Sequence, residues 1–155
     1  MAKLSEILVS ILIIGTATAT QSFNNMAEKA REVEAKLILG AINMLQQPFL
    51  LEKQRFASTL EELELGIPPE TENYEYKVFA LDQTQAQVTA KAKQRGLRSY
   101  TGAVFLVKNN TLGDSITVAI CETAQASQTP PGMPQAPQSS GYEIKCPSGS
   151  KQLGR

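Results

Sequence analysis

The sequence predicts an α+β domain, with one long N-terminal helix packed on an antiparallel sheet of about four strands. Two patterns predict this fold. Apolar residues recur at helical spacing through the first third of the chain, and farther along apolar and polar residues alternate as in half-buried strands. The length of 155 residues favours a single domain.

The predicted helix has an apolar first half and an amphipathic second half. In residues 1–24, every position of Ile7–Ile14 except Ser10 is a large aliphatic residue. Residues 25–52 are amphipathic, and no turn signal separates the two halves. One helix of about 75 Å, from Ala2 to Leu51, is therefore expected.

The amphipathic half is expected to bury one apolar stripe against the sheet, because its apolar residues are spaced by three or four. Pro48 is expected to kink or end the helix, since proline lacks the backbone donor and clashes with the preceding turn. The predicted stripe consists of Met26, Ala30, Val33, Leu37, Ala41, Met44 and Leu45.

The remainder of the globular domain, which spans 25–155, divides into a loop (53–72) and a sheet region (73–155). In the loop, Ser58-Thr59-Leu60-Glu61 has the pattern of a capping box, so a short helix is expected there. A segment rich in proline and glutamine, Gln125–Gly141, is expected to be a mobile loop. The predicted strands are Tyr74–Ala80, Gln85–Lys93, Ala103–Val107 and Ile116–Cys121, with Gly141–Cys146 as a further edge strand.

The composition excludes several classes of function. The sequence has no histidine, which excludes Ser-His-Asp and Cys-His catalysis and sites with histidine metal ligands. Two cysteines cannot build a four-thiolate zinc site or hold an iron–sulfur cluster. With 15 basic and 15 acidic residues the net charge is zero, unlike a generally basic nucleic-acid binder. We expect no enzymatic activity, no cofactor and no metal.

The two cysteines, Cys121 and Cys146, favour a disulfide that closes a loop of about 25 residues, worth about 3 kcal/mol in the chain-entropy model. This interpretation requires an exported protein. The alternative is a pair of unrelated buried thiols in a cytosolic protein.

The N-terminus allows two interpretations. In the first, Lys3 and the aliphatic run form a secretory signal peptide that is cut after Ala19, which leaves a secreted or periplasmic binding domain. In the second, the apolar segment is an uncleaved membrane helix. Glu6 favours the second, because a carboxylate in a membrane helix costs about 2.5–3.5 kcal/mol and usually marks a functional site.

The segment Leu4–Gly15, LSEILVSILIIG, resembles the N-terminal signature of type IV pilins and pseudopilins, with an acid, an aliphatic run and then a glycine. Phe56–Leu63 is similar to the loop that follows the pilin helix. Later segments, including Ser99–Val104 and Ile120–Thr123, resemble a cyanobacterial branch of pilin-like proteins. The resemblance covers nearly the whole chain and implies the type IV pilin fold.

The resemblance implies a structural subunit, major or minor, of a type IV pilus or of a type II secretion-like pseudopilus. A prepilin peptidase and the pilus assembly machinery would be partners, and the new N-terminus would be methylated. The subunit would cross the inner membrane once, with its domain outside the cytoplasm, and then join an extracellular or periplasmic filament of identical or related pilin subunits.

Two groups of N-terminal residues have roles implied by the resemblance. Glu6 would neutralise the N-terminal amine of an adjacent subunit, and removal of Met1 would place that amine on Ala2. The aliphatic side chains would contact membrane lipid before assembly and the filament core afterwards. They are Ile7, Leu8, Val9, Ile11, Leu12, Ile13 and Ile14.

A basic run lies between Asp82 and Asp114 and contains Lys91, Lys93, Arg95 and Arg98. One interpretation is a contact surface for DNA or polysaccharide. The other is a solvated sheet face, which we favour because two of these residues lie on the polar side of an alternating strand.

Overall fold

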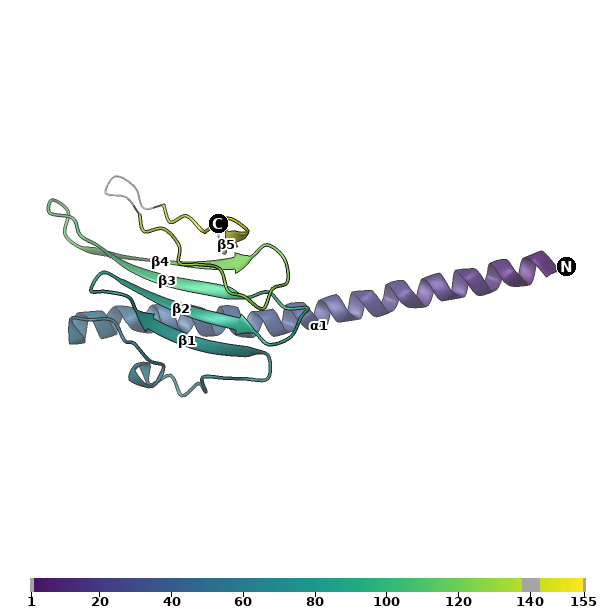
Figure 1. The fold of residues 1–155 in the computed structure, drawn as a ribbon, viewed down its shortest axis with the longest axis horizontal. Coiled ribbons are helices and arrows are strands. Elements are labelled where there is room, and N and C mark those ends of the chain that lie inside the picture. The colour runs from purple at the N-terminus through teal and green to yellow at the C-terminus, as the bar shows by residue number, and fades with distance from the viewer. Residues whose placement is uncertain (1, 138–142, 155) are drawn as a thin grey trace.

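The computed structural model describes the backbone of residues 2–137 and 143–154, and the side chains of residues 20–137 and 143–154. It has the predicted α+β fold, a long helix packed on an antiparallel sheet (Figure 1). The elements are α1 (Ala2–Lys53), the 3₁₀ helix η1 (Glu61–Leu63), β1 (Tyr74–Ala80), β2 (Gln85–Ala92), β3 (Tyr100–Val107), β4 (Ser115–Thr123) and β5 (Ser150–Gln152).

The sheet is a meander in which each strand pairs antiparallel with the next, in the order β1-β2-β3-β4-β5. It has five strands where about four were expected, and β5 on the edge beside β4 accounts for the difference. The predicted edge strand Gly141–Cys146 was wrong in its described part. Residues 143–146 form only one isolated bridge, between Lys145 and Gln135, and Gly141 lies outside the described residues.

The helix α1 continues past Pro48 and ends at Lys53, so the prediction that this proline could end it was wrong. Pro48 lies on the exposed side of α1, where water can satisfy the carbonyl that loses its donor. Beyond it, Leu50 is buried and holds the last turn against the domain. The helix ends at Gln54, which adopts a left-handed conformation and donates its N–H to the carbonyl of Leu50.

The capping pattern after α1 is displaced by one residue from its predicted position. The carboxylate of Glu62, not Glu61, accepts hydrogen bonds from the backbone N–H and the hydroxyl of Ser58. The N–H of Glu62 donates in turn to Thr59 Oγ1. The resulting helix, η1, is one 3₁₀ turn, because Glu64 already adopts a left-handed conformation.

The central strand β3 is buried on both faces. On one face, Tyr100 and Val104 belong to clusters that include residues of α1. On the other face, Phe105 packs with Ile144 and Met133 of the C-terminal segment. In the described part of Gln125–Gly141, the carbonyls of Ser127 and Pro131 accept hydrogen bonds from the hydroxyls of Ser99, just before β3, and Thr101, on β3.

Candidate functional site

The helix α1 has two apolar faces on opposite sides. The side chains that pack against the sheet, which we call the inner face, are Ala35, Leu39, Ile42, Asn43, Gln46 and Leu50, all buried. The side chains that point away from the sheet, which we call the outer stripe, are Phe23, Met26, Ala30, Val33, Leu37, Met44 and Leu51, all exposed.

The predicted orientation of α1 was therefore wrong. Of the seven residues expected to face the sheet, five belong to the outer stripe, and only Ala41 and Leu45 are partly buried. Leu37 is 69% exposed, whereas Leu39, two residues farther on, is completely buried. Helical spacing identifies an apolar stripe, but on a helix with two such stripes it does not say which one the sheet covers.

Two buried amides fix the inner face against the domain. Gln46 donates to the carbonyl of Ala57 and accepts from its N–H, both at 2.9 Å. Asn43 donates to the carbonyl of Ala119 at 3.2 Å. Gly102 on β3 makes room for this contact, since a Cβ there would lie 2.7 Å from Val88 Cγ1 and 3.0 Å from Asn43 Oδ1.

Two buried carboxylates, each with basic partners, also lie where α1 packs on the domain. Buried Glu32 on α1 accepts the N–H of Arg98 at 3.0 Å and lies 3.8 Å from its guanidinium. Glu122 on β4 is also buried, with Lys151 at 3.1 Å and Lys36 of α1 at 3.7 Å. A buried carboxylate is costly without a partner, so these pairs favour a single position of α1 on the sheet.

Glu34 connects α1 to the start of β1. Its carboxylate accepts hydrogen bonds from Thr71 and Tyr76 through Oε1 and from Asn73 through Oε2. Burial raises the pKa of Glu34, but the three hydrogen bonds outweigh this effect, and the pKa lies below its ordinary value. The pKa of Tyr76 is raised, first by burial and then by the charge of Glu34. Glu34 is therefore ionised at neutral pH.

The basic run is not an unpaired cationic patch. Lys91 lies 3.9 Å from Glu75, and Lys93 pairs with Glu70. Arg98 turns inward to Glu32, while Arg95 is exposed. The structure thus does not join the four side chains into a surface for a polyanion.

The predicted assembly residues lie outside the described side chains. This applies to Glu6 and Ala2 and to the aliphatic residues Ile7, Leu8, Val9, Ile11, Leu12, Ile13 and Ile14, although α1 runs through these positions. Among the described residues, no helical segment is long and apolar enough to cross a membrane. The described residues also contain no group of three or more acidic or cysteine side chains placed to hold a metal.

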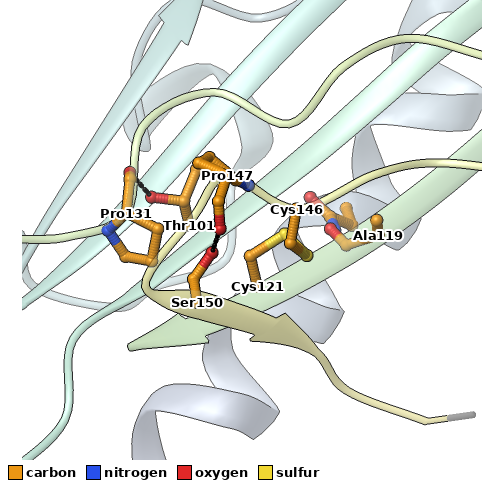
Figure 2. Close-up of a disulfide and its surroundings, with 8 residues drawn as sticks. Thr101, Ala119, Cys121, Pro131, Cys146, Pro147 and Ser150 are labelled. Atoms are coloured by element: carbon orange, nitrogen blue, oxygen red, sulfur yellow. Dashed lines mark hydrogen bonds between the residues drawn. A yellow bond between two sulfur atoms is a disulfide. The ribbon is translucent and has the colours of Figure 1, made fainter. Parts of the chain in front are cut away.

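The disulfide joins β4 to the C-terminal segment, with the pairing expected from the sequence. The Cα atoms of Cys121 and Cys146 are 5.7 Å apart. Figure 2 shows that hydrogen bonds flank it on the same surface, from Thr101 to the carbonyl of Pro131 and from Ser150 to that of Pro147. The covalent bond and these contacts hold the C-terminal segment against β3 and β4, on the face of the sheet that points away from α1.

Comparison with known families agrees with this architecture. A profile described as type IV pilin-like G and H matches residues 32–147, about three quarters of the chain. The chain belongs to this type IV pilin-like family. The resemblance found in the sequence is thereby confirmed. Searches of curated proteins and of solved structures gave no match.

The matched range of the pilin-like chain begins at Glu32, the first buried side chain of α1 in the described part. It includes both cysteines and all strands except β5. A pilin-like family is a structural, non-enzymatic kind of protein, so a structural role follows from membership.

Sequence reasoning missed Phe23 and Leu51, the two ends of the outer stripe, and the buried polar residues of the inner face. A signal for the stripe was present in the sequence. Phe23, Ala30, Leu37, Met44 and Leu51 are spaced by seven residues throughout, a regularity that a helix lying on a sheet does not need.

Proposed function

We propose that this chain is a structural subunit of a type IV pilus or of a related pseudopilus, and that α1 carries both membrane attachment and assembly. One observation supports this most directly. The N-terminal half of α1 extends beyond the sheet as a bare helix (Figure 1), and the side chains of residues 20–27 are all exposed. A helix without packing partners in its own domain needs a lipid or protein environment for its apolar positions.

In this proposal, residues 1–24 hold the subunit in the inner membrane and then enter the filament core, with the globular domain 25–155 outside the cytoplasm. Glu6 neutralises the amine of Ala2 on an adjacent subunit. Both charges are costly in an apolar core, and each lowers the cost of the other only when they are paired. A prepilin peptidase that methylates the new N-terminus fits the same scheme.

The N-terminus of the mature protein distinguishes this proposal from its rival. We expect N-terminal sequencing or intact-mass analysis of the native protein to find a chain that begins at Ala2, methylated or not. A chain that begins at Thr20 would have lost Glu6 and the aliphatic run. It would support the alternative of a secreted or periplasmic binding domain and overturn the filament subunit.

Glu6 itself can be tested in the filament. Glu6→Ala should leave the domain folded but reduce its incorporation at least tenfold, since ~1.4 kcal/mol per subunit corresponds to that factor. Ser5→Ala is the matched control and should assemble normally. Immunoblots of sheared filaments against membrane fractions measure the ratio. Equal incorporation of both variants contradicts the role given to Glu6.

A further inference from the structure

The strand β1 leaves half of its outer edge open. It is an edge strand, with β2 as its only neighbour in the sheet order (Figure 1). The chain just before β1 covers the first half of its other side. The N–H of Thr71 donates to the carbonyl of Tyr74 at 2.8 Å. The N–H of Tyr76 donates to the carbonyl of Pro69 at 2.7 Å, and the cover ends there.

Beyond Tyr76, the backbone groups on this side of β1 have no partner. In an antiparallel pair, the N–H and C=O of alternate residues point toward the neighbouring strand, and those of the residues between them point away. Tyr76 donates away from β2, so the N–H and C=O of Val78 and Ala80 also point away from β2. None of these groups has a hydrogen bond within the described part of the chain. The edge can therefore accept one more strand.

The open half also lacks the features that usually protect an edge strand. Exposed edges in native proteins carry prolines or charged side chains, which discourage pairing with other chains. The open half, Val78–Leu81, has neither and is apolar throughout. Phe79 is 41% exposed and Leu81 is 46% exposed. An apolar, unprotected edge of this kind indicates a surface that another chain covers.

A hollow of about 200 Å³ lies beside the open half, between β1 and the loop that precedes it. The residues that line it include Leu60, Glu61, Pro69, Tyr76, Val78 and Phe79. Apolar side chains therefore lie next to the free backbone groups of Val78. This combination is typical of sites that bind a peptide as an added strand, in which main-chain hydrogen bonds give affinity and a pocket selects a side chain.

The loop beside the hollow carries a strong negative charge. Residues 58–73 contain five glutamates and no lysine or arginine. Two of the five pair with basic side chains elsewhere in the domain. The others, Glu61, Glu64 and Glu72, are exposed and have no ion pair within the described residues. A basic partner suits this edge, whereas a second copy does not, because pairing two β1 edges would bring two acidic loops together.

We propose that Val78–Leu81 binds an extended, basic segment of another protein as a further strand of the sheet. The N–H and C=O groups of Val78 and Ala80 pair with the backbone of that segment. One of its apolar side chains fills the hollow, and a neighbouring lysine or arginine pairs with Glu61. This site is separate from the contacts of the proposed function, since neither Glu6 nor the N-terminal half of α1 takes part in it.

Peptide binding to the full chain in micelles of an uncharged detergent tests the charge of the site. The probe is a short fluorescent peptide in which lysine and valine alternate, and fluorescence anisotropy measures its affinity. Glu61→Lys should weaken binding about fivefold or more, because an attraction becomes a repulsion. Glu64→Lys is the matched control, since it changes the net charge equally but lies outside the lining of the hollow, and it should stay within about twofold of wild type. Equal weakening in the two variants, or no binding to wild type, overturns the proposal.

Two altered peptides separate strand addition from simple attraction of charges. A peptide with glutamate in place of lysine should bind wild type far more weakly, because it meets an acidic loop. A lysine–valine peptide that is methylated on every backbone nitrogen keeps its charge and side chains but cannot donate hydrogen bonds to β1. It should also lose most of its affinity. Equal affinity of the methylated and unmethylated peptides overturns the added strand.

Amide hydrogen exchange, followed by NMR on the isotope-labelled full chain, locates the added strand without any substitution. Saturating lysine–valine peptide should slow exchange at Val78 and Ala80 by about tenfold or more, because their N–H groups gain partners. Phe79 is the internal control, since its N–H already points to β2 and should change little. Unchanged exchange at Val78 and Ala80 overturns the proposal. Slow exchange there that develops with protein concentration, without peptide, would assign the edge to a second copy and overturn the basic partner.

Discussion

The inner face and the outer stripe of α1 are both apolar, but they are built differently. The inner face mixes Leu39 and Ile42 with two buried amides, and each amide bonds to the backbone at one fixed point. Sliding the helix on the sheet would leave these amides unpaired, at a cost of about 1–3 kcal/mol each. The outer stripe contains no amide side chain, and its members share only their apolar character and their regular spacing. Polar contacts therefore fix the position of α1 on the sheet, whereas the outer stripe makes no such contact within the described part of the chain.

The largest expected difference between the two faces concerns leucines two residues apart. Leu39→Ala should lower the free energy of unfolding by about 2–5 kcal/mol, because it leaves a cavity in the core. Leu37→Ala should change it by less than about 0.5 kcal/mol, because Leu37 is exposed. Urea unfolding of the full chain in detergent, followed by circular dichroism, measures both. Similar losses in the two variants would contradict the assignment of the faces.

A smaller difference is expected between two adjacent glutamines. Gln46→Ala removes both hydrogen bonds to Ala57 and leaves a buried N–H and a buried carbonyl without that partner. The expected loss of stability is about 1–3 kcal/mol. Gln47, the next residue of the helix, is only partly buried and serves as the control, and Gln47→Ala should lie within about 0.5 kcal/mol of wild type. If Gln46→Ala unfolds at the same urea concentration as Gln47→Ala, the amide does not fix the helix.

The smallest expected effect lies outside both faces, in the turn that follows α1. The hydrogen bond from Arg55, followed by the N–H of Ser58, lowers the pKa of Glu62 from its ordinary 4.5 to about 2. Because the folded-state pKa is the lower one, the stabilisation is complete above pH 4.5 and is lost as the pH falls from 4.5 toward 2. The pair is partly solvated, so the effect is small.

Melting temperatures of wild type and Glu62→Gln measure this contribution. Wild type should melt higher by a constant margin between pH 6 and 8, and the margin should shrink below about pH 4.5. A margin that grows as the pH falls would contradict the pKa shift. Glu61→Gln is the control from the same turn and should show no such convergence with wild type, since the hydrogen bonds from Arg55 and Ser58 go to Glu62.

The regular elements were largely predictable because their signals are local. The alternation of apolar and polar residues predicted both bounds of β1 correctly and the bounds of β2 to within one residue. The observed strands β3 and β4 are longer than the predicted ones, by up to three residues at one end. The strand β5 was missed because Ser150–Gln152 has no apolar residue to alternate, and pairing with β4 alone makes it a strand. The capping pair shifted from Glu61 to Glu62 because the tight 3₁₀ turn and the partner Arg55 are consequences of folding.

The sequence by itself determined the α+β class, the long helix, the likeness to type IV pilins and the pairing of two cysteines, because periodicity, motifs and composition are written along the chain. Only the tertiary structure decided which face of α1 the sheet covers. Two apolar stripes share that helix, and the choice depends on where Ala57, Gly102 and Ala119 come together in space. Their meeting with Asn43 and Gln46 buries one stripe and leaves the other exposed.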